Sequence, residues 1–155
     1  MRWLPCAQFR AIETMMDLDD AVAAVRAVRR IDADVPVIAM MTFTREGRTP
    51  TGISAAEAAR EITGAGATAV GANCSFGPAD MLPLVAGMRQ AVDVPIAAKP
   101  SAGLPSVIEG RLMYPVDAIS FARYAVLLRD AGASLLGGCC GTTPEYVAAM
   151  AKALS

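Results

Sequence analysis

The chain has 155 residues, of which 54% are hydrophobic and 19% charged, which is enough apolar material for one globular domain and too little length to expect two. Its formal net charge is −1, from 14 basic and 15 acidic residues without a block of like charge, which argues against nucleic acid or an anionic membrane as a partner. With these partners disfavoured, we expect the protein to bind small molecules. No apolar run approaches the roughly 18 residues that a membrane helix needs, and the first ten residues lack the apolar core of a signal peptide. We therefore expect a cytoplasmic protein.

Five short apolar runs alternate with five segments of helical period along the chain. In chain order we expect strand 9–14, helix 17–31, strand 35–43, helix 54–66, strand 67–75, helix 78–91, strand 94–103, helix 117–132, strand 134–140 and helix 143–154. Asp17 and Ser54 are candidate N-caps, and Pro144 suits a first helical turn. Pro83 and Gly87 should weaken the third helix.

The alternation of strands and helices, with strands that are apolar on both faces, predicts an α/β fold with a parallel sheet and right-handed crossovers. Two irregular loops, 44–53 and 100–116, directly follow strands. Loops at this end of the strands commonly bind ligands in α/β proteins. We therefore expect the functional site at the carboxyl edge of the sheet.

Four cysteines and no histidine limit the chemistry that the site can perform. Four cysteines in a chain of this length are too few for a disulfide scaffold, and clustered cysteines in a reducing compartment more often bind metal or react. Without histidine, a metal site must be built from thiolates, and no histidine-based catalytic dyad or triad is available.

Three of the cysteines lie where predicted strands end. Cys74 ends the third strand, and Cys139 and Cys140 end the fifth, so a parallel sheet would place all three at one edge. Three thiolates about 2.3 Å from one ion suit a tetrahedral zinc with an open fourth position. Because strands are about 4.8 Å apart, the third and fifth strands of a flat sheet would be roughly 10 Å apart, so curvature and turns must bring the sulfurs together.

The glycines around the cysteine pair fit a metal site, because adjacent side chains of a strand point to opposite faces unless the backbone leaves extended geometry. Gly137, Gly138 and Gly141 permit that departure. A tight turn with small buried cysteines is an equally good explanation at this point. Cys6 has no comparable placement, and we interpret it as structural or incidental.

Other polar residues also end strands. Glu13 either lies at a solvated strand end or binds a substrate amine. Asn73 either orients a metal ligand through hydrogen bonds or is an ordinary turn residue. Lys99 could bind an anion, but a surface lysine is the more ordinary interpretation.

Three segments resemble the signature sequences of the homocysteine S-methyltransferase family: GANCSFGP around Cys74, AAKPSAGLP after the fourth strand, and GGCCGTTPEYV around Cys139 and Cys140. The resemblance runs from about Phe9 to the C-terminus. It implies a (β/α)8 barrel with Zn²⁺ at its C-terminal mouth, bound by Cys74, Cys139 and Cys140.

The resemblance also implies substrates and site residues. The activity would be methyl transfer to the thiol of homocysteine to give methionine, with Glu13 binding the amino group. From its position beside Cys74, we also place Asn73 among the candidate substrate-binding residues. The family's methyl donors are methyltetrahydrofolate acting through cobalamin, betaine and S-methylmethionine, and the sequence does not select among them.

The chain resembles units four to eight of the barrel, so we expect residues 1–155 to form a single partial homocysteine-binding domain without the first three units. The opening MRWLPCAQ fits the family poorly, and a start codon inside a longer gene or a frameshift near the start would explain it. A partial barrel exposes sheet edges, which predicts self-association or a complementing N-terminal half-barrel. Two alternatives are a zinc-binding fragment without activity and an unrelated α/β protein with buried cysteines.

Overall fold

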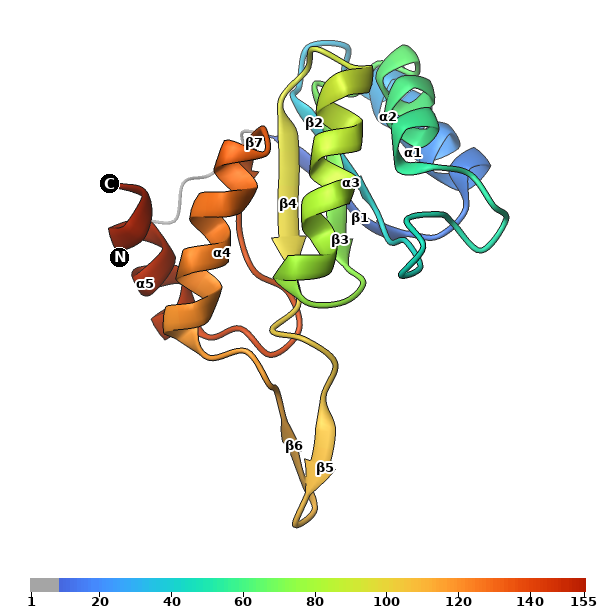
Figure 1. The fold of residues 1–155 in the computed structure, drawn as a ribbon. Coiled ribbons are helices and arrows are strands. Elements are labelled where there is room, and N and C mark those ends of the chain that lie inside the picture. Colours follow the sequence, from blue (N-terminus) through green and yellow to red (C-terminus); the bar gives the residue numbers. More distant parts are fainter. Residues whose placement is uncertain (1–8) are drawn as a thin grey trace.

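The computed structural model describes residues 9–155, so the expectation for Cys6 lies outside the described residues. The elements are β1 (Arg10–Met15), α1 (Leu18–Ile31), β2 (Val37–Met41), α2 (Ala55–Gly64), β3 (Ala69–Cys74), α3 (Pro78–Ala91), β4 (Ile96–Pro100), β5 (Ser106–Ile108), β6 (Arg111–Met113), α4 (Ala118–Asp130), β7 (Ala133–Leu136) and α5 (Pro144–Leu154) (Figure 1). All ten predicted elements are present.

A five-stranded sheet forms the centre of the molecule, with strand order β1-β2-β3-β4-β7. Every neighbouring pair is parallel, so the carboxyl ends of all five strands lie along one edge. The predicted α/β class with a parallel sheet is confirmed. Among the described residues, β1 and β7 are the two outer strands of this sheet.

The helices begin where the sequence places capping residues. The carboxylate of Asp17 accepts hydrogen bonds at the start of α1, the hydroxyl of Ser54 does so for α2, and Asp117 does so for α4. Proline lies in the first turn of both α3 and α5. Local capping chemistry therefore sets these helix starts.

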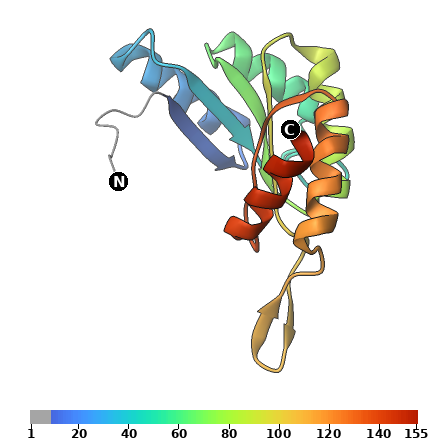
Figure 2. The ribbon, with the colours of Figure 1, turned by 90° about the vertical axis from the view of Figure 1, so that its left-hand side faces the viewer.

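The two faces of the sheet have different neighbours. Helices α1 to α4 cover one face, where Val25, Ile62 and Met81 from three of these helices pack against Val70 and Ile96 of the sheet (Figure 1). Helix α5 lies beside α4 (Figure 2). The rings of Phe121 and Tyr146 are in edge-to-face contact between these two helices, and Leu136 of β7 packs against the same cluster. The opposite face carries a hollow of about 390 Å³, lined mostly by apolar side chains of β1, β2, β4 and β7.

The structure differs from the sequence expectation in two places. Four of the five strands of the sheet are shorter than predicted, and the fifth ends at Leu136, before the cysteine pair. The 100–116 loop contains an antiparallel hairpin, β5–β6, that projects beyond the carboxyl edge (Figure 1). Helix α3 has its expected bounds, Pro78–Ala91, with Pro83 inside it.

None of the helices in residues 9–155 combines the length and the apolar character needed to cross a membrane.

Candidate metal centre

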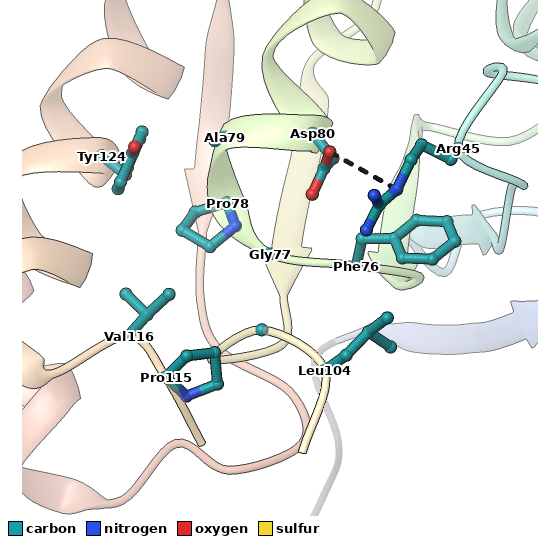
Figure 3. Close-up of a pocket in the computed structure, with 11 residues that line it drawn as sticks. Arg45, Phe76, Gly77, Pro78, Ala79, Asp80, Leu104, Pro115, Val116 and Tyr124 are labelled. Carbon is teal, nitrogen blue, oxygen red and sulfur yellow. Dashed lines mark ion pairs between the residues drawn. The ribbon is translucent and has the colours of Figure 1, made fainter. Parts of the chain in front are cut away.

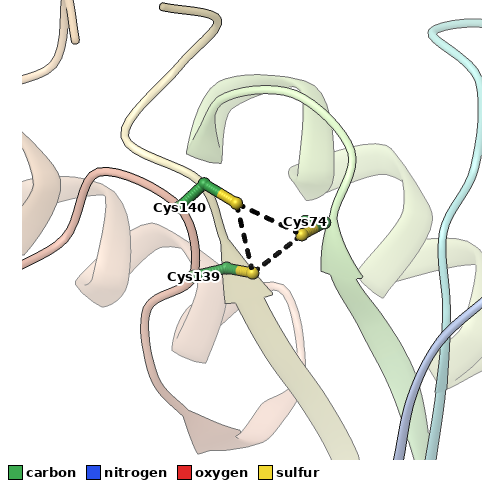
Figure 4. A group of neighbouring side chains, drawn as sticks. All are labelled: Cys74, Cys139 and Cys140. Carbon is green, nitrogen blue, oxygen red and sulfur yellow. Dashed lines mark hydrogen bonds between the residues drawn. The ribbon is translucent and has the colours of Figure 1, made fainter. Parts of the chain in front are cut away.

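Three cysteine sulfurs meet at the carboxyl edge of the sheet (Figure 4). Cys74 is the last residue of β3, whereas Cys139 and Cys140 lie in the turn between β7 and α5. The Sγ atom of Cys74 is 2.8 Å from that of Cys139 and 3.7 Å from that of Cys140, and the latter two are 4.0 Å apart. The fold thus brings together the three residues that the sequence predicts to be metal ligands.

The turn after β7, which carries Cys139 and Cys140, crosses the end of β4, which lies between β3 and β7. Backbone hydrogen bonds hold it there: Gly137 N–H donates to the carbonyl of Ala98 (3.1 Å), and Cys139 N–H donates to that of Pro100 (2.9 Å). In return, Ala102 N–H donates to the carbonyl of Cys140 (2.8 Å). This crossing removes the separation of roughly 10 Å that a flat sheet would impose.

The backbone at the site leaves extended geometry on both sides. Cys74 has φ 57° and Ser75 has φ 57°, and Gly141 after the cysteine pair has φ 80°. A Cβ atom on Gly141 would lie 2.4 Å from the ring of Tyr114, so only glycine fits there. The prediction that glycine allows the cysteine pair to turn is confirmed at this position.

Asn73 lies directly behind the sulfurs and is fully buried. Its Oδ1 accepts from Thr14 N–H and its Nδ2 donates to Thr14 Oγ1, both at 2.7 Å. The same Nδ2 is 4.0 Å from the Sγ of Cys139. These contacts suit a residue that orients a metal ligand, and the contact of Asn73 with a substrate stays a prediction. Sequence reasoning missed Thr14, whose positive φ of 61° had no sequence signal.

Cys74 and Cys139 differ in acidity. Burial raises the pKa of Cys74 to about 12, and its hydrogen bonds to Cys139 and Cys140 add to the shift. Burial opposes ionisation of Cys139 too, but hydrogen bonds from the Cys74 thiol, the Cys140 backbone and thiol, and the Asn73 amide outweigh it and lower its pKa. Of these two thiols, Cys139 is therefore the one that ionises more readily.

The donor set fits a thiophilic ion. Sulfurs about 2.3 Å from a tetrahedral zinc lie roughly 3.8 Å apart, which two of the three observed spacings match. The third, between Cys74 and Cys139, is 2.8 Å and would have to widen by about 1 Å. Cys140 is exposed and the other two are half-buried, so an ion held here would keep one side open to a ligand.

Glu13 lies on the open face of the sheet, close to the sulfurs. Its Oε1 is 2.6 Å from the Nζ of Lys99, and both side chains line the 390 Å³ hollow. The sequence interpretation of Lys99 as an ordinary surface lysine is therefore incomplete, since it has a specific partner. Binding of a substrate amine by Glu13 stays a prediction.

A second hollow, of about 290 Å³, lies among the loops that follow β2, β3 and β4 (Figure 3). Arg45 lies over the ring of Phe76, 4.8 Å from its centroid, and 4.0 Å from a carboxylate oxygen of Asp80. Arg45 is largely exposed and Asp80 partly so, and the hollow has no cysteine. It offers no nucleophile and no metal ligand set, so we assign the chemistry to the cysteine cluster.

Two curated relatives carry names with a shared activity. Methionine synthase of Mycobacterium tuberculosis is 33% identical over 150 residues, covering 93% of this chain and 12% of the relative. Homocysteine S-methyltransferase 3 of Arabidopsis thaliana is 32% identical over 155 residues, covering 96% of this chain and 44% of the relative. The chain thus spans less than half of the length of these curated relatives.

Solved structures share the fold. The metallated form of the homocysteine methyltransferase MmuM from Escherichia coli superposes with a TM-score of 0.76 at 22% identity, covering 96% of this chain and 46% of that one. The described strands and helices therefore form part of a TIM-like barrel. A sequence profile described as homocysteine S-methyltransferase matches residues 5–154, nearly the whole chain. The chain belongs to the homocysteine S-methyltransferase family.

Proposed function

We propose that this chain is the zinc-binding part of an S-methyltransferase that methylates the thiol of homocysteine to give methionine. The single observation that carries the proposal is the meeting of Cys74, Cys139 and Cys140 from two distant segments in a chain of this family. Family membership removes the alternative of an unrelated α/β protein with buried cysteines. Residues 1–155 would act as one domain.

The protein's own residues would supply a preformed ligand set. The crossing turn holds Cys139 and Cys140 against the end of β4, and the left-handed backbone at Cys74 directs its sulfur toward them. Asn73, fixed by its two bonds to Thr14, would orient Cys139. The metallated state of the Escherichia coli relative supports a metal here.

When bound, zinc would keep the substrate thiol in its nucleophilic thiolate form at neutral pH. The exposed side of the cluster, at Cys140, gives the substrate sulfur access. Homocysteine as the substrate is supported by the names of the relatives. The methyl group would come from a separate donor that enters from the carboxyl edge of the sheet.

Zinc content tests the proposal. We expect about one zinc per chain in protein purified under reducing conditions, by elemental analysis, and loss of that zinc in Cys140→Ser. Cys6→Ser is the matched control, because it removes a thiol outside the proposed ligand set, and it should keep the metal. Zinc-free wild-type protein, or equal zinc in both variants, would refute the proposed centre.

A second candidate function is favoured by the open face of the sheet. Within residues 9–155, no helix covers the hollowed face, and β1 and β7 expose their outer backbone edges. A chain of this shape would bind zinc but need a complementing half-barrel for methyl transfer. Assays with and without an added N-terminal barrel segment of a relative would distinguish the two, since only the second candidate predicts activity that depends on the segment.

Self-association is the other way to cover these edges. We expect light scattering to show oligomers that increase with protein concentration. A single monomeric species at high concentration would contradict this expectation.

A further inference from the structure

Cys140 is the most exposed member of the cysteine cluster. Cys74 and Cys139 are half-buried, whereas the Cys140 side chain is open to solvent. Gly141 follows it directly, with φ 80°. Glycine has more backbone freedom than any other residue, so a thiol beside it keeps one direction only where neighbouring groups restrict the turn. The two segments that flank the β5–β6 hairpin supply such groups.

The segment that leads into the hairpin, residues 101–105, is bonded to both cysteine-bearing segments. Ala102 N–H donates to the carbonyl of Cys140 (2.8 Å), and Ser101 N–H donates to that of Cys74 (3.4 Å). Both Ser101 and Ala102 are buried. These bonds hold the carbonyl of Cys140 in place against the end of β4.

The segment that leaves the hairpin, residues 114–116, contacts the next residue of the cysteine turn. A Cβ atom on Gly141 would lie 2.4 Å from the Cγ and Cδ1 atoms of Tyr114 and 2.7 Å from its Cδ2 atom. The near end of the ring therefore lies directly over the Cα atom of Gly141, in van der Waals contact. Ring carbons make this contact, so a phenylalanine ring would preserve it.

Tyr114 is itself restrained by the base of the hairpin. Val116 N–H donates to the carbonyl of Ala102 (3.1 Å), which joins the two flanking segments. The hydroxyl of Tyr146 on α5 donates to the carbonyl of Val116 (2.9 Å). Tyr114 lies two residues before Val116, and its side chain is half-buried. The ring is therefore a fixed surface for the turn to pack against.

We propose that Tyr114 is a positioning residue for the metal centre, because its ring restricts the turn at Gly141 and so fixes the direction of the Cys140 thiol. This rests on the proposed function, since it requires a metal at the cysteine cluster. What it adds is a residue from a third segment of the chain, outside both cysteine-bearing segments. A ligand that is already ordered binds more tightly, because less conformational entropy is lost when the metal binds.

The zinc affinity of Tyr114→Ala tests the proposal, measured by competition with a chromophoric chelator. We expect binding about five- to thirtyfold weaker than in wild type, which corresponds to ordering the backbone of one residue. Tyr114→Phe keeps the ring carbons and should restore wild-type affinity. Tyr124→Ala is the matched control, because it removes a half-buried tyrosine that lines the second hollow, and it should keep wild-type affinity.

Alkylation of Cys140 distinguishes positioning from a general loss of structure. A thiolate bound to zinc is shielded from alkylation, so the rate reports how firmly Cys140 is bound. At saturating zinc, iodoacetamide should modify Cys140 several-fold faster in Tyr114→Ala than in wild type and leave the rate at Cys74 unchanged, as followed by peptide mass spectrometry. A ring with a merely structural role would lower the free energy of unfolding without changing either readout.

Tyr114→Val provides the same test if the alanine variant does not fold. It keeps an apolar side chain but lacks the Cδ atoms that contact the turn, so both effects should appear in it. Wild-type zinc affinity in the folded variant, or equal acceleration at Cys74 and Cys140, would overturn the role of Tyr114 and leave the metal centre in place. Wild-type protein without zinc would overturn the proposed function, and the positioning role with it.

Discussion

Asn73 connects β1 to the residues behind the cysteine cluster, so its removal tests how far the site depends on this connection. Asn73→Ala removes two hydrogen bonds of 2.7 Å to Thr14 and the contact with Cys139, at a position with no solvent exposure. Each bond contributes about 1 kcal/mol, and an unsatisfied partner adds about 1–3 kcal/mol. Because Thr14 is itself exposed, water will replace part of what is lost. We expect the free energy of unfolding to fall by about 2–4 kcal/mol.

Urea denaturation measures this loss, and the chain offers a matched control. Gln90→Ala removes a side-chain amide from an exposed position on α3 and should change the free energy of unfolding by less than about 0.5 kcal/mol. A double-mutant cycle with Thr14→Val should give a coupling of about 1 kcal/mol for the bond to Thr14 Oγ1. If Asn73→Ala costs no more than the control, the argument that this amide ties β1 to β3 is refuted.

Three further predictions concern stability. Thr63→Val should raise the free energy of unfolding by about 1 kcal/mol in urea titrations, because the Thr63 hydroxyl is buried without a hydrogen-bond partner. A lower free energy of unfolding in the variant would contradict this prediction. Gly141→Ala should lower the free energy of unfolding more than Gly110→Ala does, and it should also reduce the zinc content. Both glycines have positive φ, but only a Cβ atom on residue 141 would meet the ring of Tyr114. Equal effects of the two substitutions would refute the steric argument. Hydrogen bonds from backbone N–H groups of α4 lower the pKa of Asp117 in the folded state. Its contribution to the free energy of unfolding is therefore present at neutral pH and disappears as the pH falls below about 4. The difference in melting temperature between wild type and Asp117→Ala should narrow at that pH, and a constant difference would contradict the prediction.

The helices were predictable because their signals are local. Asp17 and Ser54 each cap a helix where the sequence places them, and α3 has the bounds that were expected from it, Pro78–Ala91. Four of the five strands were predicted too long, because the apolar runs continue past the last hydrogen bond between neighbouring strands. Hydrophobic periodicity does not show where a neighbouring strand ends.

The β5–β6 hairpin was missed because its turn has an atypical sequence. Glu109 and Gly110 form the two-residue connection, and both have positive φ, at 50° and 74°. Such turns usually carry Asn-Gly or Asp-Gly, and glutamate in the left-handed region gives no warning in the sequence. The flanking strands have only three residues each, too few to show an alternating pattern.

The composition of the cysteine cluster was predictable, but its geometry was not. Strand ends place Cys74 and Cys139 at one edge, yet the spacing between them depends on a turn that crosses β4 through backbone hydrogen bonds. The partner of Lys99 was likewise hidden, because Glu13 is 86 residues away in the chain and three strands away in the sheet. Contacts of this kind follow from sheet order and curvature, which no local pattern encodes.

The position of the cluster has a consequence for folding. Strand β7 has only four residues and is an outer strand of the described sheet, whereas β3 lies inside it. A metal held by Cys74, Cys139 and Cys140 would therefore connect the turn that follows this outer strand to β3 in the interior of the sheet, across β4. Binding to the folded state alone raises stability in proportion to the logarithm of the free metal concentration over its dissociation constant. The same linkage makes metal affinity depend on the pairing of β7 with β4, so any segment that covers the outer edge of β7 would strengthen the metal site without contacting a cysteine.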